Sequence, residues 1–205
     1  MTTQADSNAT RASLLSRARQ RESQAWHDLV DLYGPLIAHW CQRSGLDHHA
    51  SADCVQQTFA AVLRSLSSYQ PRKSSGAFRS WLWTIAANKI RDHRRSEHRE
   101  TGGVGGSTAL QALQRVPMEQ DAGDELDVDV EPVAPEQLGA LLTRAMEQIY
   151  DEFTPRTWEI FRRAVVEQMT TSVVATEFAV TSAAVRQIRS RVLRRLRQQL
   201  GDIEP

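Results

Sequence analysis

The sequence predicts an all-α fold: two small helical domains joined by a flexible acidic linker, with a helix-turn-helix as the C-terminal domain. Apolar residues recur at steps of three and four in both halves of the chain, and no segment alternates convincingly as a strand would. Residues 98–137 lack this period and combine clustered glycines with an acidic run that Pro132 and Pro135 interrupt. We therefore expect domains at residues 11–97 and 138–201, with residues 98–137 as the linker.

The charges of the chain are segregated although they sum to zero, with 25 basic and 25 acidic side chains. Residues 1–99 carry 14 basic and 8 acidic residues, whereas residues 100–137 carry one arginine and nine acids. Residues 186–200 hold six arginines and no acid. Clustered cationic charge is the electrostatic footprint of a nucleic-acid-binding protein. A solvated helix surface is the alternative interpretation of such a run.

The first domain is predicted to contain a short helix followed by three longer ones. Ser23 is a candidate N-cap for the second helix, and Pro35 either kinks that helix or starts another. The third helix begins after Asp47, and the fourth covers about residues 78–95, after a loop at residues 67–76. The apolar residues expected on the inner faces are Leu14, Leu15, Ala18, Trp26, Leu29, Val30, Tyr33, Ile37, Trp40, Val55, Phe59, Val62, Leu63, Leu66, Phe78, Trp81, Leu82, Ile85 and Ile90.

The second domain is predicted to hold four helices. The first covers about residues 138–149, and Thr154-Pro155 supplies a cap and a first-turn proline for the next. A shorter helix follows at about residues 171–178, and Thr181 can cap a last helix that reaches about Leu200. The apolar residues expected to face inward are Leu138, Leu141, Leu142, Ala145, Ile149, Trp158, Phe161, Val165, Val185, Ile188, Val192 and Leu196.

The last two predicted helices form a helix-turn-helix, whose second helix enters the major groove and reads base edges with its N-terminal residues. The turn at Ala179-Val180 departs from the glycine that such turns often contain. The base-reading candidates are Ser182, Ala183, Arg186, Gln187 and Arg189. The candidates for phosphate contacts, which supply affinity rather than sequence preference, are Arg191, Arg194, Arg195 and Arg197.

The predicted helix at residues 78–95 combines aromatic rings with cations, the two features that hold single-stranded nucleic acid by stacking and charge. Trp81 falls on the apolar stripe and is expected in the core, whereas Trp83 lies off that stripe and is expected to be exposed. The loop before this helix offers further aromatic and basic side chains that could contact the same single strand. The candidates for single-strand contacts are Tyr69, Arg72, Lys73, Arg79, Trp83, Arg91, Arg94 and Arg95.

Asp53, Gln56 and Gln57 are spaced so that they share one face of the third predicted helix. An acid beside amides is no catalyst by itself, but as an interface it could meet arginines of a partner helix. A solvated polar face is the alternative.

Two segments of the first domain resemble bacterial RNA polymerase sigma factors. Asp53-x-x-Gln56-x-x-Phe59 is similar to the pattern of their polymerase-binding helix, and residues 78–95 are similar to their strand-opening helix. The helix-turn-helix is similar to the family's second DNA-binding module. The two-module size resembles the extracytoplasmic-function (ECF) subfamily, the smallest sigma factors.

The resemblance implies a non-enzymatic function without cofactors. Asp53, Gln56 and Gln57 would bind core RNA polymerase, the C-terminal helix would read the −35 promoter element as duplex, and residues 78–95 would melt the −10 element. Asn88 matches a family position that faces an extruded promoter base. The resemblance also implies an anti-sigma factor as a partner. Ala52 and Gln57 stand where acids are usual, so the polymerase-binding face is less acidic than is typical.

Several other functions are not indicated by the sequence. The glycines of residues 102–106 lack the lysine and preceding strand of a phosphate-binding loop, and no nucleophile motif is readable. His48 and His49 are adjacent, and therefore point to different faces of a helix, so we expect no metal site. Cys41 and Cys54 form no paired framework, and no apolar leader or membrane span is readable. We expect a cytoplasmic protein.

Two alternative functions remain open at this stage. An ordinary helix-turn-helix regulator would use the first domain for dimerisation or sensing, and a dimer would bind a palindromic operator without polymerase. A helical scaffold that binds no DNA would leave every arginine run without a role.

Overall fold

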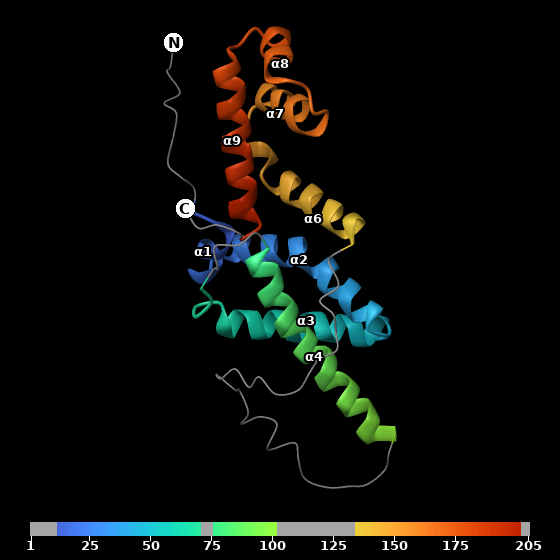
Figure 1. Cartoon of the computed structure of the whole chain (residues 1–205). Coiled ribbons are helices and arrows are strands. Elements are labelled where there is room, and N and C mark those ends of the chain that lie inside the picture. The colour runs from blue at the N-terminus through green and yellow to red at the C-terminus, as the bar shows by residue number, and fades with distance from the viewer. Residues whose placement is uncertain (1–11, 71–75, 102–133, 202–205) are drawn as a thin grey trace.

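The computed structural model describes residues 12–70, 76–101 and 134–201, with side chains as far as Glu97 in the second range. Every regular element in these ranges is helical, which confirms the all-α expectation (Figure 1). The first domain consists of α1 (Leu14–Arg19), α2 (Ser23–Arg43), α3 (His48–Ser65) and α4 (Ala77–Thr101). The second consists of α6 (Pro135–Gln148), the 3-10 turn η1 (Tyr150–Glu152), α7 (Pro155–Phe161), the π-helical η2 (Arg162–Val166), α8 (Thr171–Glu177) and α9 (Ser182–Gln199).

Short polar side chains fix where the helices of the first domain begin. The Ser13 hydroxyl accepts a hydrogen bond from the Ser16 N–H at 3.2 Å, and the Asp47 carboxylate accepts one from the Ala50 N–H at 2.8 Å. Each satisfies an amide that the first helical turn leaves without a partner. Helices α2, α3 and α4 then pack against one another around a fully buried core.

Three details of the first domain differ from the expected pattern. Ser23 is the first residue of α2 rather than its cap, and Glu22 occupies the cap position without a side-chain hydrogen bond. Helix α2 continues through the exposed Pro35, so no second helix starts there. Helix α4 extends six residues past the predicted end at Arg95, as far as Thr101.

Three apolar residues that were expected on inner faces are exposed instead. Val30 is 41% exposed on α2, Leu63 is 53% exposed on α3, and Leu138 is 36% exposed on α6. Val30 and Leu63 each adjoin a buried residue in sequence but point away from the core, because a helix turns by about 100° per residue. Leu138 lies in the first turn of α6, where neither sequence neighbour is buried.

The second domain is built on two capped helices and a small core. The Thr154 hydroxyl accepts from the Thr157 N–H at 3.3 Å ahead of α7, and the Thr181 hydroxyl accepts from the Ala184 N–H at 3.1 Å ahead of α9. Both threonines are the predicted caps. The small core that joins α7, α8 and α9 consists of Ile160, Val174, Ala175 and Val185.

The turn between α8 and α9 is a Schellman motif centred on Ala179. The Val180 N–H bonds the Ala175 carbonyl at 2.9 Å, and the Ala179 N–H bonds the Thr176 carbonyl at 3.3 Å. Ala179 takes a φ of 50°, which lies in the left-handed region that favours glycine. The turn therefore has the geometry that glycine usually adopts, and the Cβ of Ala179 makes this conformation strained.

The two domains share one hydrophobic cluster, so they form a single packed body in this structure (Figure 1). The Tyr33 hydroxyl on α2 donates to the Leu200 carbonyl at 2.7 Å, and the Gln148 amide on α6 donates to the Asp28 carbonyl at 2.8 Å. Gly201 has a φ of 67°, and a Cβ there would lie 2.8 Å from Leu15 Cδ1. This contact between domains is not predicted by the sequence patterns.

The predicted linker overlaps helices at both of its ends. Helix α4 reaches Thr101, and α6 begins at Pro135 rather than at residue 138. Residues 102–133 lie outside the described residues, as do Arg72 and Lys73.

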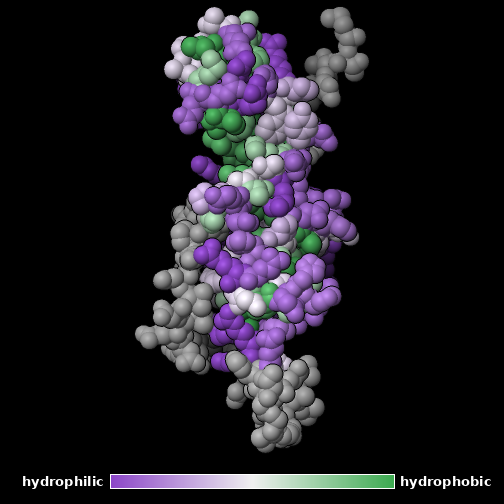
Figure 2. Space-filling model, turned by 90° about the vertical axis from the view of Figure 1, so that its right-hand side faces the viewer, coloured by the Kyte–Doolittle hydropathy of each residue, from purple (hydrophilic) through white to green (hydrophobic). Residues whose placement is uncertain are grey.

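The face seen in Figure 2 is mostly hydrophilic, and its hydrophobic residues gather mainly on the second domain. Two valines of the second domain, Val166 and Val173, are 64% and 47% exposed. None of the helices that the structure describes combines the length and the apolarity needed to cross a membrane.

Replacing Ala179 by glycine is expected to stabilise the protein by up to about 1 kcal/mol, because glycine adopts the left-handed conformation without a Cβ penalty. The matched control is Ala183→Gly, on the exposed face of α9, which should destabilise by roughly 1 kcal/mol. Denaturant unfolding measures both. Destabilisation by Ala179→Gly as large as that of the control would contradict the strained turn.

Replacing Gly201 by alanine is expected to destabilise the protein by about 1–3 kcal/mol, since the new methyl would press on Leu15 at a position with positive φ. Gly139→Ala on α6 is the control, because a Cβ there would meet nothing within 4 Å. It should stabilise by roughly 0.5–1 kcal/mol. Thermal unfolding curves that shift equally for the two variants would contradict the close contact between domains.

Candidate nucleic-acid and polymerase interfaces

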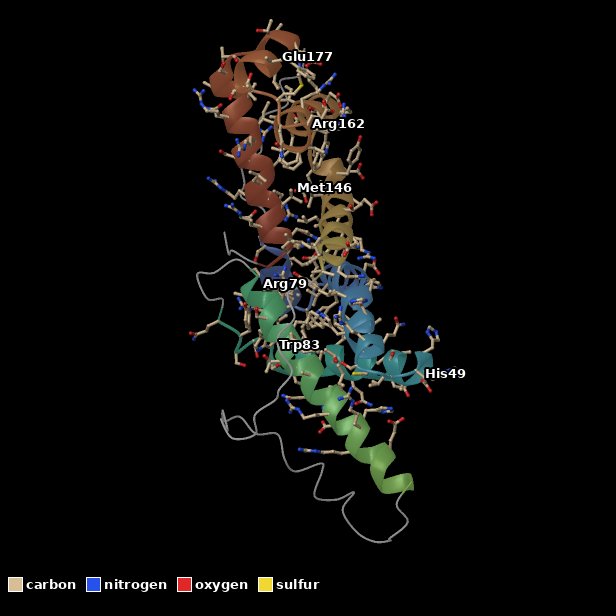
Figure 3. All side chains as sticks on the ribbon, turned by 45° about the vertical axis from the view of Figure 1, so that its right-hand side comes forward. His49, Arg79, Trp83, Met146, Arg162 and Glu177 are labelled. Carbon is tan, nitrogen blue, oxygen red and sulfur yellow. The ribbon has the colours of Figure 1, made fainter. Side chains whose placement is uncertain are left out.

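The N-terminal half of α9 presents a polar face to solvent. Thr181 fixes the start of the helix, and Val185 and Val192 are buried beneath it. Side chains tipped with nitrogen project from α9 on the side away from α6 (Figure 3). Among the base-reading candidates, Ala183, Arg186, Gln187 and Arg189 are exposed, and Ser182 is half-buried. Ala183, Arg186 and Gln187 also line one surface hollow with Arg191 and Arg194.

The arginines in the C-terminal half of α9 divide into two groups. Arg191 and Arg194 are exposed, and the guanidinium of Arg191 lies 5.6 Å from the centre of the Phe153 ring. Arg195 is only 7% exposed and pairs with Glu152 through two hydrogen bonds, of 2.7 and 2.8 Å. This differs from the exposed position that we expected for a phosphate-binding group. The sequence spacing could have predicted this burial, because Arg195 follows Val192 by three residues and so lies on the apolar stripe of the helix.

Ion pairs hold the first helix of the helix-turn-helix against the rest of the domain. Arg163 on η2 reaches Glu177 on α8 at 2.9 Å, and it also reaches Glu167 at 2.8 Å. Arg162 donates to Glu159 at 2.5 Å, and this hydrogen bond lowers the pKa of the Glu159 carboxyl (Figure 3). Arg162, Glu167 and Glu177 are exposed, and Glu159 and Arg163 are half-buried, so each ion pair contributes little to stability.

The aromatic residues around α4 pack inward more than the sequence suggested. Tyr69 is 8% exposed, and its ring lies 4.6 Å from that of Trp81. Trp83, expected to be free for stacking, is half-buried with its ring 5.1 Å from that of Trp40 on α2 (Figure 3). Trp81 packs against the core as predicted. Arg79 is half-buried at the start of the helix.

The second half of α4 carries most of the residues expected to contact the single strand. Asn88, Arg94 and Arg95 are exposed, and Arg91 is half-buried. The Arg91 guanidinium donates to the Asn88 side-chain oxygen at 2.7 Å, which leaves the amide nitrogen of Asn88 as a free donor edge. Arg94 donates to the Ser44 carbonyl on the neighbouring loop. The sequence analysis treated Asn88 and Arg91 as independent candidates. Their spacing of three residues, which makes two side chains neighbours on a helix, could have predicted this hydrogen bond.

Helix α3 shows one polar face to solvent and one face to the core. Asp53, Gln56 and Gln57 are all exposed, as expected of an interface. The same stripe continues through the exposed Ala60, Leu63 and Arg64. Leu63 was assigned to the core from its hydrophobicity, but its spacing of seven residues from Gln56 places it on this outer face.

The described residues hold no group of three or more histidine, cysteine or acidic side chains arranged to bind a metal ion. The rings of His48 and His49 lie 6.1 Å apart near the start of α3. Cys41 and Cys54 are both buried and free of disulfides.

Comparison with known proteins finds relatives among bacterial sigma factors. The RNA polymerase sigma factor NccH of Alcaligenes xylosoxydans xylosoxydans is 35% identical over 83 residues, which span 40% of this chain and 43% of that one. The ECF RNA polymerase sigma factor SigE of Mycolicibacterium smegmatis is 28% identical over 65% of this chain and 47% of that one. The chain thus spans less than half the length of these two relatives. A solved RsbN–BldN complex matches with a TM-score of 0.34 and 18% identity, over 89% of this chain and 96% of that one.

Two family models match the two domains separately. The model described as Sigma-70 region 2 matches residues 29–100, and the model described as Sigma-70, region 4 matches residues 151–198. Together they cover more than half of the chain, in the order predicted from the sequence. The chain belongs to the sigma-70 family of RNA polymerase sigma factors, with region 2 in its first domain and region 4 in its second.

Proposed function

We propose that this chain is an ECF-type sigma factor that binds core RNA polymerase and directs promoter-specific initiation of transcription. The observation that carries the proposal is that one chain holds both sigma regions. In each region, the helix assigned to DNA contacts, α4 or α9, has an exposed polar face. The chemistry is binding and not catalysis. Opening of the duplex would draw on binding energy, offset by an unstacking cost of about a few kcal/mol per base step.

Polymerase binding is assigned to the outer face of α3. Asp53 offers a carboxylate to an arginine of a partner helix, and Gln56 and Gln57 extend the polar surface. Leu63 adds an exposed apolar side chain on the same stripe, of the kind that anchors an interface. Since Ala52 and Gln57 leave this face with little charge, the apolar contact carries more of the affinity here.

Capture of the −10 strand is assigned to the second half of α4. Arg91 holds the oxygen of the Asn88 amide, so the amide nitrogen is presented to the edge of an extruded base. Arg94 and Arg95 follow Asn88 by about two turns of the helix and are placed for the backbone of the strand. Trp83 and Tyr69 support this surface from within, through their packing on Trp40 and Trp81.

Reading of the −35 element is assigned to the N-terminal half of α9. Arg186, Gln187 and Arg189 are exposed where a recognition helix contacts base edges, and arginine and glutamine suit guanine and adenine respectively. Arg194 is placed for phosphates, whereas Arg195 is engaged by Glu152 and is left out of the DNA contacts. With polymerase and promoter as partners, the protein would work in the cytoplasm, and an anti-sigma partner stays a prediction of the family resemblance.

Reversing the charge of Asp53 tests the polymerase interface. Asp53→Lys is expected to weaken binding to core RNA polymerase about tenfold, which corresponds to roughly 1.4 kcal/mol. The control is Glu147→Lys, the same change of charge on an exposed position of α6. Fluorescence anisotropy of the labelled full chain titrated with core enzyme measures both. Equal affinities of the two variants for core enzyme would show that α3 is not part of the polymerase interface.

Two neighbouring arginines of α9 are expected to give opposite results. Arg195→Ala should destabilise the fold by about 3 kcal/mol, because it leaves Glu152 without its partner of the pair in a largely buried site. Arg194→Ala should change stability by less than about 0.5 kcal/mol. It should instead weaken all DNA sequences alike and flatten the salt dependence of binding by about one unit. Thermal unfolding and binding at several salt concentrations separate the two effects, and a reversed pattern would refute the assignment.

A further inference from the structure

The C-terminal half of α9 is docked on the first domain (Figure 1). Val192 and Leu196 of α9 enter the hydrophobic cluster that contains residues of α1 and α2. Where α9 ends, the Leu200 carbonyl accepts a hydrogen bond from the Tyr33 hydroxyl on α2 at 2.7 Å. The helix assigned to duplex DNA at its N-terminal end is therefore held at its C-terminal end by the domain assigned to the −10 strand.

The backbone after α9 lies directly against α1 and the start of α4. A Cβ on Gly201 would lie 2.8 Å from Leu15 Cδ1 and 3.3 Å from Phe78 Cβ. A larger residue here would have to displace Leu15 or push the end of α9 away from the first domain. The two domains thus meet at a point where only glycine fits without a shift.

The contact between the domains contains buried amides as well as apolar side chains. Gln198 and Gln199 at the end of α9 are 3% and 1% exposed. The Gln199 amide donates to the Gln148 side-chain oxygen at 2.8 Å, and the Gln148 amide donates to the Asp28 carbonyl on α2 at 2.8 Å. Domain interfaces that are more polar than a permanent core permit relative motion of the domains. After separation, these amides can exchange their protein partners for water.

The docked arrangement is too short to reach both promoter elements. At about 1.5 Å per residue, the chain advances about 23 Å from Arg186 to Gly201 and about 15 Å from Phe78 to Asn88. Since Gly201 lies against Phe78, the backbones of the two reading positions are at most about 45 Å apart. Elements at −35 and −10 are roughly 25 base pairs apart, which is about 85 Å along the duplex. The reach of two side chains does not close this difference.

We propose that the docked arrangement is a closed, autoinhibited state of the free chain, and that α9 must leave the first domain before both promoter elements are read. The inference rests on the proposed function. In the closed state Arg186 and Asn88 are both exposed, so either element can be contacted alone but not both on one promoter. Residues 102–133 connect the domains, and a chain of that length can reach about 100 Å when extended. The covalent connection therefore permits the separation.

Energy transfer between one dye on each domain tests the closed state in solution. The dyes are attached to Asp31→Cys on α2 and Thr143→Cys on α6, two exposed positions on helices that pack against each other. The native Cys41 and Cys54 are buried. The free full chain is expected to show high transfer, and core polymerase with a promoter carrying both elements should convert it to low transfer. Low transfer in the free chain, or high transfer that persists in the complex, would overturn the proposal.

Opening the contact by substitution tests the autoinhibition. With core polymerase, Gly201→Val should bind a promoter carrying both elements about tenfold more tightly than wild type, because a closed fraction lowers the apparent affinity. Its binding to a duplex carrying only the upstream element should be unchanged. The matched control is Gly139→Val on α6, where a Cβ would meet nothing within 4 Å. Gln148→Ala removes two hydrogen bonds of the contact without the steric change, and it should shift the affinity in the same direction.

The outcomes separate this proposal from the proposed function. If Gly201→Val and Gln148→Ala both bind the promoter with both elements no more tightly than wild type, the contact does not restrain the chain and the autoinhibition is refuted. If wild type does not bind core polymerase at all, the proposed function is refuted instead. The transfer efficiency of the free chain would then still decide whether the closed state forms.

Discussion

The apolar stripe along α9 is the interaction on which the rest of the structure depends. At its start, Val185 closes the small core of the helix-turn-helix with α7 and α8. Further along, Val192 and Leu196 enter the large cluster that contains residues of α1, α2 and α6. One helix therefore joins the second domain internally and fastens it to the first (Figure 1). Because this stripe faces inward along the whole helix, the opposite positions, which include Arg186 and Arg194, face solvent.

The position of a residue around its helix also explains which predictions from the sequence were confirmed. Local signals predicted where several helices begin: Thr154 and Thr181 cap the helices that they were predicted to cap, and α3 begins directly after Asp47 as expected. Residue type failed where it disagreed with helical position. Leu63 was placed in the core because it is apolar, and Arg195 in solvent because it is charged, and the structure reverses both. Counting positions along the helix favours the observed placement in each case.

Contacts between residues far apart in the sequence could not be predicted from the sequence. The ring of Trp83 meets that of Trp40, and the Tyr33 hydroxyl donates to the Leu200 carbonyl. Each joins residues that no local period relates, so only the packing of whole helices brings them together. These contacts also bear on the proposed function, because the rings of Trp83 and Tyr69, which were expected to stack on bases, pack inside the first domain instead.

In the proposed function, both domains read one promoter together with polymerase. The most direct measurement is transcription by core enzyme plus the purified chain from a library with randomised upstream sequence, followed by sequencing of the templates that are transcribed. We expect two preferred elements at a fixed separation, with the upstream preference altered by Arg186→Ala and the downstream preference altered by Asn88→Ala. Stable binding to a single palindrome without polymerase, with no transcripts, would contradict it.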